Sequence, residues 1–159
     1  MKRLSMLLAG SVLVTSAHAV NWVEMTKSNS GSTFSLDVNS IEHSDINIID
    51  EKNVENITVS MLRTYPTSKE APKEKGTGTG TTKEKSIHHS DQQLLISCKD
   101  FSYYKRAYVD YNADNKVLKS WQSEKPILTT KDFIITVPKS VGRTLIEYAC
   151  KSYEDSKLS

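Results

Sequence analysis

The stretch that decides the fold is residues 136–151, TVPKSVGRTLIEYACK. Pro138 ends the preceding segment, and Ser140 is a favourable N-cap for a helix that begins at Val141. At helical spacing, one face collects the small and apolar residues Gly142, Leu145, Ile146, Ala149 and Cys150. The stretch therefore predicts an amphipathic helix near the end of the chain, with Cys150 on its buried face.

The opposite face of the predicted helix is charged. It carries Arg143, Glu147 and Lys151, which recur every fourth residue. The order of Glu147 before Lys151 suits both an ion pair one turn apart and the helix dipole. We interpret this segment as a terminal helix held on a sheet.

The first residues have the pattern of a secretory signal peptide. A positive start is followed by a mostly apolar run over residues 4–14, and residues 17–19, Ala-His-Ala, fit a cleavage site. We expect residues 1–19 to be removed, so that the mature protein begins at Val20. The apolar run is too short to span a bilayer, and no cysteine lies near the cleavage site for a lipid anchor. The prediction is an exported protein of a Gram-negative bacterium, located in the periplasm, at the cell surface or outside the cell.

The remaining chain has the length of one domain, predicted at residues 20–155, with residues 156–159 as a disordered tail. The whole chain has 21 basic and 19 acidic residues. The predicted leader holds two of the basic residues and none of the acidic ones, which leaves 19 of each. A mature protein without net charge has no overall attraction to nucleic acid or anionic lipid, so neither is a predicted partner.

The two cysteines are Cys98 and Cys150, and the chain has no C-x-x-C motif. In an exported chain this favours a disulfide over metal binding or redox catalysis. A bond closing a loop of about 51 residues would stabilise the fold by roughly 4 kcal/mol in the chain-entropy model. Two free buried thiols are the alternative.

Apolar and polar residues alternate through much of the chain, as they do around Phe34 and Leu36. This two-residue period is typical of half-buried strands. The expected strands lie at residues 21–25, 34–38, 45–50, 57–65, 94–98, 101–111, 117–121 and 133–137. Most are joined by turn sequences, which predicts an α+β fold: an antiparallel sheet of about six strands with the C-terminal helix packed on one face and held by the disulfide.

One segment, residues 66–86, interrupts the strand pattern. It contains two prolines and alternating glycine and threonine at 76–80, with lysine and glutamate on both sides and no aromatic residue. Such a composition buries too little apolar surface to offset the entropy of ordering it. We predict a mobile loop insertion there.

Residues with catalytic or metal-binding chemistry are few. Two carboxylates could work as a general acid and base, but acidic residues in short strands and turns usually face solvent; the candidates are Asp37, Glu42, Asp45 and Asp50. His88 and His89 are adjacent, and adjacent strand residues point to opposite faces, which disfavours joint chelation of one ion. No nucleophile elbow or phosphate-binding loop is present in the sequence. We predict no enzymatic activity, no cofactor and no metal site.

The most aromatic stretch is residues 101–111. Its tyrosines and neighbouring cations could stack nucleic-acid bases or form a protein-binding surface. Alternatively, one alternating set belongs to the core and the other is ordinary surface. Export and the balanced charge favour protein over nucleic acid. The candidate partner-binding residues are Tyr103, Tyr104, Lys105, Arg106 and Tyr108.

Three segments of the chain resemble the bacterial surface-adhesin protein E family. They are FSLDVNSI at 34–41, LISCK at 95–99, and the stretch from Val-Pro-Lys-Ser at 137–140 to Ala-Cys at 149–150. The resemblance extends over roughly residues 22–153 and rests on the order of these segments and the positions of both cysteines. It implies an antiparallel sheet with a C-terminal helix tied to one face by the disulfide between Cys98 and Cys150.

The founding member of that family is a surface lipoprotein that binds host matrix and serum proteins. This chain departs from it in lacking a lipid-attachment cysteine and in carrying the insertion at 66–86. We expect a non-enzymatic, adhesin-like protein that binds a host extracellular-matrix or serum protein, or an envelope protein. The binding surface would be a sheet face or the Tyr-rich hairpin of the strands at 101–111 and 117–121. The alternatives are a periplasmic inhibitor or accessory factor of a cell-wall enzyme and, third, a small hydrolase. The oligomeric state is left open, with a homodimer among the alternatives.

Overall fold

The computed structural model describes residues 19–46, 48–50, 55–67 and 87–159. The predicted signal peptide, apart from Ala19, lies outside these residues. The predicted loop insertion at 66–86 also lies outside them, apart from Pro66 and Thr67.

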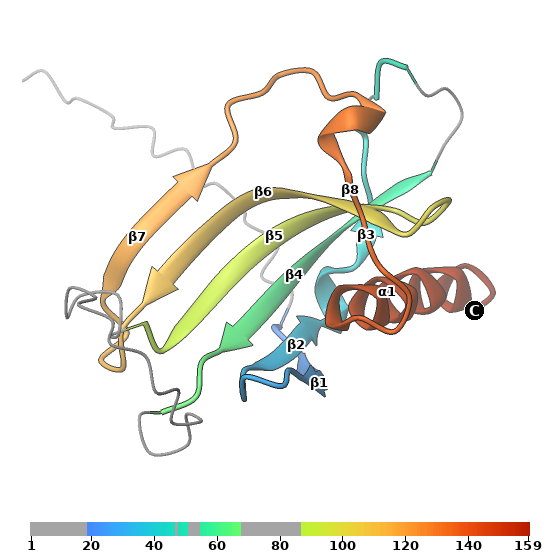
Figure 1. Cartoon of the computed structure of the whole chain (residues 1–159). Helices are drawn as coiled ribbons and strands as arrows, with labels where there is room; N and C mark the ends of the chain where they lie inside the picture. Colours follow the sequence, from blue (N-terminus) through green and yellow to red (C-terminus); the bar gives the residue numbers. More distant parts are fainter. Residues whose placement is uncertain (1–18, 47, 51–54, 68–86) are drawn as a thin grey trace, which may run out of the picture.

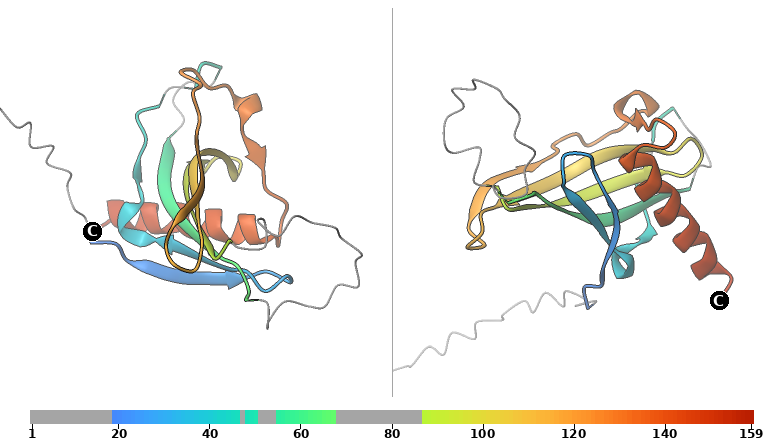
Figure 2. Two further views of the ribbon diagram at one scale, coloured as in Figure 1. Left: turned by 90° about the vertical axis from the view of Figure 1, so that its left-hand side faces the viewer. Right: turned by 60° about the horizontal axis from the view of Figure 1, so that its bottom comes forward.

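In these described residues the chain forms one curved antiparallel sheet with one long helix across its inner face (Figures 1 and 2). The strands follow the order β1-β2-β4-β5-β6-β7, with β3 paired to β4 and β8 paired to β6. In chain order the elements are β1 (Trp22–Lys27), β2 (Thr33–Asp37), η1 (Val38–Ser40), β3 (Glu42–His43), β4 (Asn56–Thr64), β5 (His89–Ser97), β6 (Ser102–Tyr111), β7 (Val117–Gln122), η3 (Thr130–Asp132), β8 (Ile134–Ile135) and α1 (Val141–Lys157). The predicted fold class is confirmed.

The helix begins where the sequence predicts. The side chain of Ser140 accepts a hydrogen bond from the backbone N–H of Arg143 at 3.2 Å, which caps the first turn. The buried residues of α1 are four of the five on the predicted apolar face, Leu145, Ile146, Ala149 and Cys150. The helix continues to Lys157, so it includes the first residues of the segment predicted as a disordered tail.

Arg143, on the charged side of the helix, is only 18% exposed. Its guanidinium lies over the ring of Phe101, 4.8 Å from the ring centre, and its Nε donates to the hydroxyl of Thr136 at 2.8 Å. Arg143 therefore ties the start of α1 to the segment that precedes it.

Two apolar clusters lie on opposite faces of the sheet. The inner cluster, under α1, consists of Leu36, Ile57, Val59, Met61, Leu94, Ile96, Leu145, Ile146, Ala149 and Cys150. The outer cluster is smaller and consists of Ile48, Leu95 and Leu128, with Ile46, Tyr104 and Phe133 packed against it. Neighbouring residues of β5 thus serve both clusters, because adjacent side chains on a strand point to opposite faces.

The predicted disulfide joins Cys98, just after β5, to Cys150 in α1, with the two Cα atoms 5.8 Å apart. The bond is confirmed, and no described cysteine is free. It joins α1 to the segment that connects two central strands, so the helix is held covalently on the inner face. No helix in the described part of the chain is long and apolar enough to cross a membrane.

The expected strand at 45–50 is wrong. Of its described residues, only Ile48 forms a β-bridge, to Leu128. The hydroxyl of Ser44 accepts from the backbone N–H of Ile46 at 3.3 Å, a local bond that competes with strand pairing. Ile48 and Leu128 pack over Leu95 and form the outer cluster rather than extending the sheet.

Candidate functional site: an aromatic groove at the sheet edge

The hairpin of β6 and β7 forms one side of the sheet, and β7 is its outermost strand (Figure 1). No described strand pairs with the outer side of β7, and all six of its residues are exposed. Its apolar residues Val117, Leu118 and Trp121 are 60%, 44% and 43% exposed. An unpaired strand edge presents backbone N–H and C=O groups in the pattern that another strand would pair with. This edge therefore exposes apolar side chains together with unpaired backbone groups.

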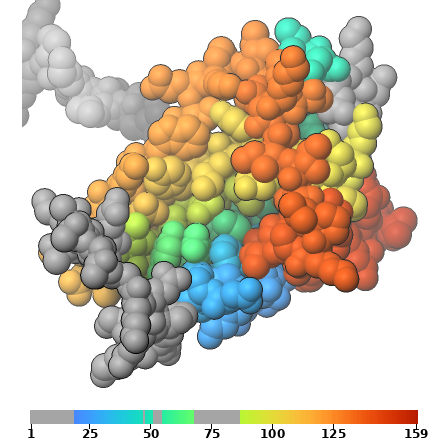
Figure 3. Space-filling model, in the orientation of Figure 1, coloured from blue at the N-terminus to red at the C-terminus, as the bar shows by residue number. Residues whose placement is uncertain are grey.

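A groove of about 420 Å³ lies beside this hairpin, between β6, Trp121 of β7 and the segment leading to β8. We call it the aromatic groove; its walls are formed by Tyr103, Tyr104, Lys105, Tyr108, Trp121, Asp132 and Ile134. Figure 3 shows the side chains of β6 and β7, coloured yellow to orange, on the surface of this face. The lining is more apolar than polar in character, although the groove is open to solvent.

Tyr108 and Trp121 are directly opposite each other in the β6–β7 pair. Their rings stack with centroids 5.9 Å apart and an interplanar angle of 26°. The ammonium groups of Lys105 and Lys119 lie 5.6 Å and 5.9 Å from the centre of the Tyr108 ring, within cation–π range. The arrangement is an aromatic pair, half-buried at Tyr108 and exposed at Trp121, with positive charge beside it.

Four of the five predicted partner-binding residues, all except Arg106, line the aromatic groove, and three of them share one side of β6. Tyr103, Lys105 and Tyr108 lie on the inner side of β6, although a strict two-residue alternation would place Tyr108 on the other side. A β-bulge explains this, because Leu94 pairs with Lys105 while Gln93 pairs with Ala107, which leaves Arg106 as the extra residue.

The other two predicted residues have different surroundings. Tyr104 reaches the groove from the outer side, where its ring packs near Phe133 and its hydroxyl hydrogen-bonds the hydroxyl of Ser123. Arg106 is exposed and lines a separate polar hollow, and its backbone carbonyl accepts from the N–H of Ser123 at 2.7 Å. Tyr104 therefore has a packing role, and Arg106 does not belong to the aromatic groove.

Trp121 is the groove residue that the sequence analysis missed. The turn at 112–115 and the returning strand were both predicted, and residues facing each other across a hairpin share a side of the sheet. The hairpin pattern thus indicated that Trp121 could lie beside a tyrosine of β6. Which tyrosine it faces depends on the register of the hairpin, which shifts between Asp110 and Tyr111.

The candidate catalytic carboxylates do not form a shared site. Asp37 is buried and accepts backbone N–H groups of Asn21 and Asn39 at 2.9 Å and 3.1 Å, which supports the turn after β2. Asp50 accepts two hydrogen bonds from Thr130, and these lower the pKa of its carboxyl group. Both bind backbone or hydroxyl groups of the protein itself, and Glu42 and Asp45 are exposed.

The two adjacent histidines lie closer than expected. The Nδ1 atoms of His88 and His89 are 3.0 Å apart, and the ring of His89 stacks on Tyr111 with centroids 4.8 Å apart. His88 immediately precedes β5, and its backbone N–H donates to the carbonyl of Tyr111 at 2.8 Å. Within the described ranges, no group of three or more His, Cys, Asp or Glu side chains is arranged to hold a metal ion.

Comparison of the chain with models of protein families, with curated proteins and with solved structures found no match. The candidate site is therefore argued from its own geometry.

Proposed function

We propose that this chain is an exported, non-enzymatic binding protein that holds a protein partner along β7 and in the aromatic groove. The observation that carries the proposal is the stack of the half-buried Tyr108 on the exposed Trp121 at an unpaired sheet edge. Tyrosine and tryptophan are enriched among residues that dominate binding energy in protein interfaces. The disulfide agrees with export, because oxidising compartments retain such bonds.

The shape of the edge favours an extended segment of the partner. Such a segment would add beside β7 through backbone hydrogen bonds and place alternate side chains against Trp121 and the groove. Lys105 beside Tyr108 favours a carboxylate on that segment. In keeping with the resemblance to surface-adhesin protein E, the proposed partner is a host extracellular-matrix or serum protein, or an envelope protein.

The first test replaces both stacked rings. Mature protein with Tyr108→Ser and Trp121→Ser is compared with wild type in binding to matrix and envelope proteins, by pull-down and then by surface plasmon resonance. We expect at least a tenfold loss of affinity, since removing an interface hot spot costs about 2 kcal/mol or more. Tyr148→Ser is the matched control, because this tyrosine is 39% exposed but lies on α1. Wild-type affinity in the double variant would exclude the groove as the binding surface.

The second test concerns location. Intact cells are treated with external protease, and the periplasmic fraction is then assayed for the full chain. Cleavage on intact cells is expected for an adhesin-like protein. Full protection in the periplasm would favour the alternative, an inhibitor or accessory factor of a cell-wall enzyme.

A further inference from the structure

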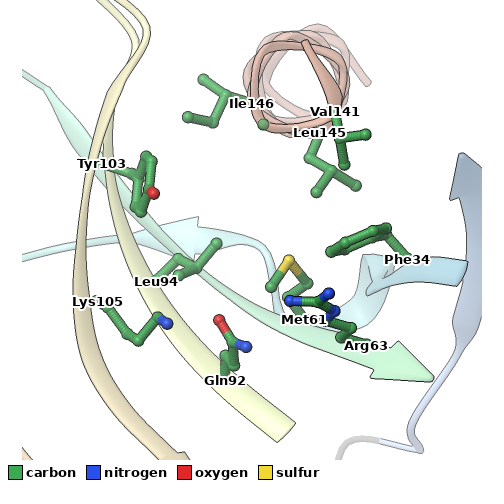
Figure 4. Close-up of a pocket in the computed structure, with 11 residues that line it drawn as sticks. Phe34, Met61, Arg63, Gln92, Leu94, Tyr103, Lys105, Val141, Leu145 and Ile146 are labelled. Atoms are coloured by element: carbon green, nitrogen blue, oxygen red, sulfur yellow. The ribbon is translucent and has the colours of Figure 1, made fainter. Parts of the chain in front are cut away.

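A second hollow, of about 290 Å³, lies between the start of α1 and the inner face of the sheet. Its walls come from β2, β4, β5, β6 and α1, and the apolar ones are Phe34, Met61, Leu94, Val141, Leu145 and Ile146. Figure 4 shows these side chains around an open space, with α1 on one side and the strands curving around the other. We call this space the helix hollow.

The polar groups of the helix hollow gather at one end. Gln92, Lys105 and Arg63 line the side away from α1 (Figure 4). Gln92 is only 8% exposed, and its side-chain amide points into the hollow without a hydrogen-bond partner among the described residues. The amide atoms are accessible within the hollow, so this group can hydrogen-bond a ligand that enters it.

The same end is positively charged. The guanidinium of Arg63 is held over the rings of Phe34 and Tyr65, 5.3 Å and 4.3 Å from their centres, and its NH2 group donates to the hydroxyl of Ser32 at 3.2 Å. No carboxylate of the described residues pairs with Arg63 or with Lys105. Two cations and an amide donor therefore face one end of an apolar space, which is the chemistry of a site for an anion with an apolar body.

We propose that the helix hollow binds a single-chain aliphatic carboxylate, such as a medium-chain fatty acid. The carboxylate lies among Lys105, Arg63 and Gln92, and the chain extends between Leu94 of the sheet and Leu145 of α1. The volume is at the small end for ligand sites, so it suits one short chain rather than a folded peptide segment. This inference does not depend on the protein partner, because a purified carboxylate is tested in its absence.

The experiment is calorimetric titration of the mature protein with hexanoate, octanoate and decanoate below their micelle concentrations. We expect one saturable site per chain, with affinity rising about fourfold for each added methylene until the hollow is filled. 1-Octanol, which has the chain but lacks the charge, is expected to bind at least tenfold more weakly than octanoate. Absence of saturable octanoate binding, or equal binding of octanol, would overturn the proposal.

Two variants test whether octanoate binds in the helix hollow. Lys105→Met keeps the length of the side chain, removes its charge, and is expected to weaken octanoate at least fivefold while leaving octanol unchanged. Gln92→Leu is expected to reduce the preference for octanoate over octanol. Lys151→Met, on the exposed side of α1, is the matched control and is expected to bind octanoate as wild type does. If Lys151→Met loses as much affinity as Lys105→Met, the binding is a general charge effect and the proposed site is wrong.

Discussion

Two regions of the sheet differ in what covers them: the strands under α1, and the edge formed by β7. Under α1, the side chains of Leu36, Ile57 and Val59 are at most 1% exposed. On β7, which α1 does not reach, every residue is exposed, including Trp121. The strands of both regions carry apolar side chains, and β7 has Val117, Leu118 and Trp121, so apolar content alone does not decide burial. Burial is decided by whether an element such as α1 covers the strand.

This comparison separates stability from recognition. Burial of apolar surface is the main favourable term in folding, so the covered region should carry most of the folding free energy. The aromatic residues of the open region contribute much less to burial. If the covered region provides stability and the open region provides recognition, substitutions in the two regions should differ in their effect on the free energy of unfolding.

The largest effect is expected from removing the covalent tie in the covered region. Cys98→Ala with Cys150→Ala should lower the free energy of unfolding by roughly 4 kcal/mol, because the unfolded chain is no longer constrained by a bond between residues 52 positions apart. Urea unfolding followed by circular dichroism measures this. Wild type under reducing conditions should match the double variant. An unchanged urea midpoint would show that packing alone holds α1 on the sheet.

A smaller effect comes from removing equal amounts of side chain in each region. Ile146→Ala, at a position 1% exposed in the inner cluster, should cost about 3 kcal/mol of unfolding free energy. Leu118→Ala, at a position 44% exposed on β7, should stay within about 0.5 kcal/mol of wild type. Both are measured by urea unfolding. Similar costs at the two positions would contradict the division of roles.

The covered region was largely predictable from sequence, because its signals are local or covalent. Ser140 caps the helix, Leu145 and Ile146 repeat at helical spacing, and two cysteines in an exported chain favour one bond. Each signal needs only its own segment or one pairing. The structure confirms the helix start, the apolar face and the disulfide.

The open region was less predictable, because its geometry depends on strand register. One extra residue at Arg106 moves Tyr108 to the side of Lys105, and no local signal in the sequence marks that bulge. The helix hollow was missed for the same reason. Gln92 and Arg63 are polar residues of different strands, and only the register of β4 and β5 places both facing α1.

The smallest predicted effect lies at the far end of α1, where polar groups of the helix contact Glu55. Glu55, just before β4, accepts hydrogen bonds from Lys157 and from the hydroxyl of Tyr153, the latter at 2.6 Å. These bonds favour the carboxylate and lower the pKa of Glu55 from its ordinary value of 4.5, the contact with Lys157 contributing most. The unfolded chain therefore binds a proton at Glu55 more readily than the folded one does. The contact stabilises the fold above pH 4.5, and this stabilisation is lost as the pH falls through the lowered pKa.

Glu55→Gln should consequently lower the thermal midpoint by a few degrees at most at pH 7, because ion pairs exposed to water contribute little. At pH 3, below the ordinary value of 4.5, the difference from wild type should be smaller than at pH 7, since the stabilisation by the carboxylate is lost progressively as the pH falls. Glu154→Gln is the control, because its carboxylate contacts Lys157 at 3.2 Å within the helix but does not reach the sheet. A deficit of equal size at both pH values would mean that Glu55 acts through the shape of its side chain rather than its charge. In that case the helix end is held by packing, and the far end of α1 belongs with the covered region rather than at its polar margin.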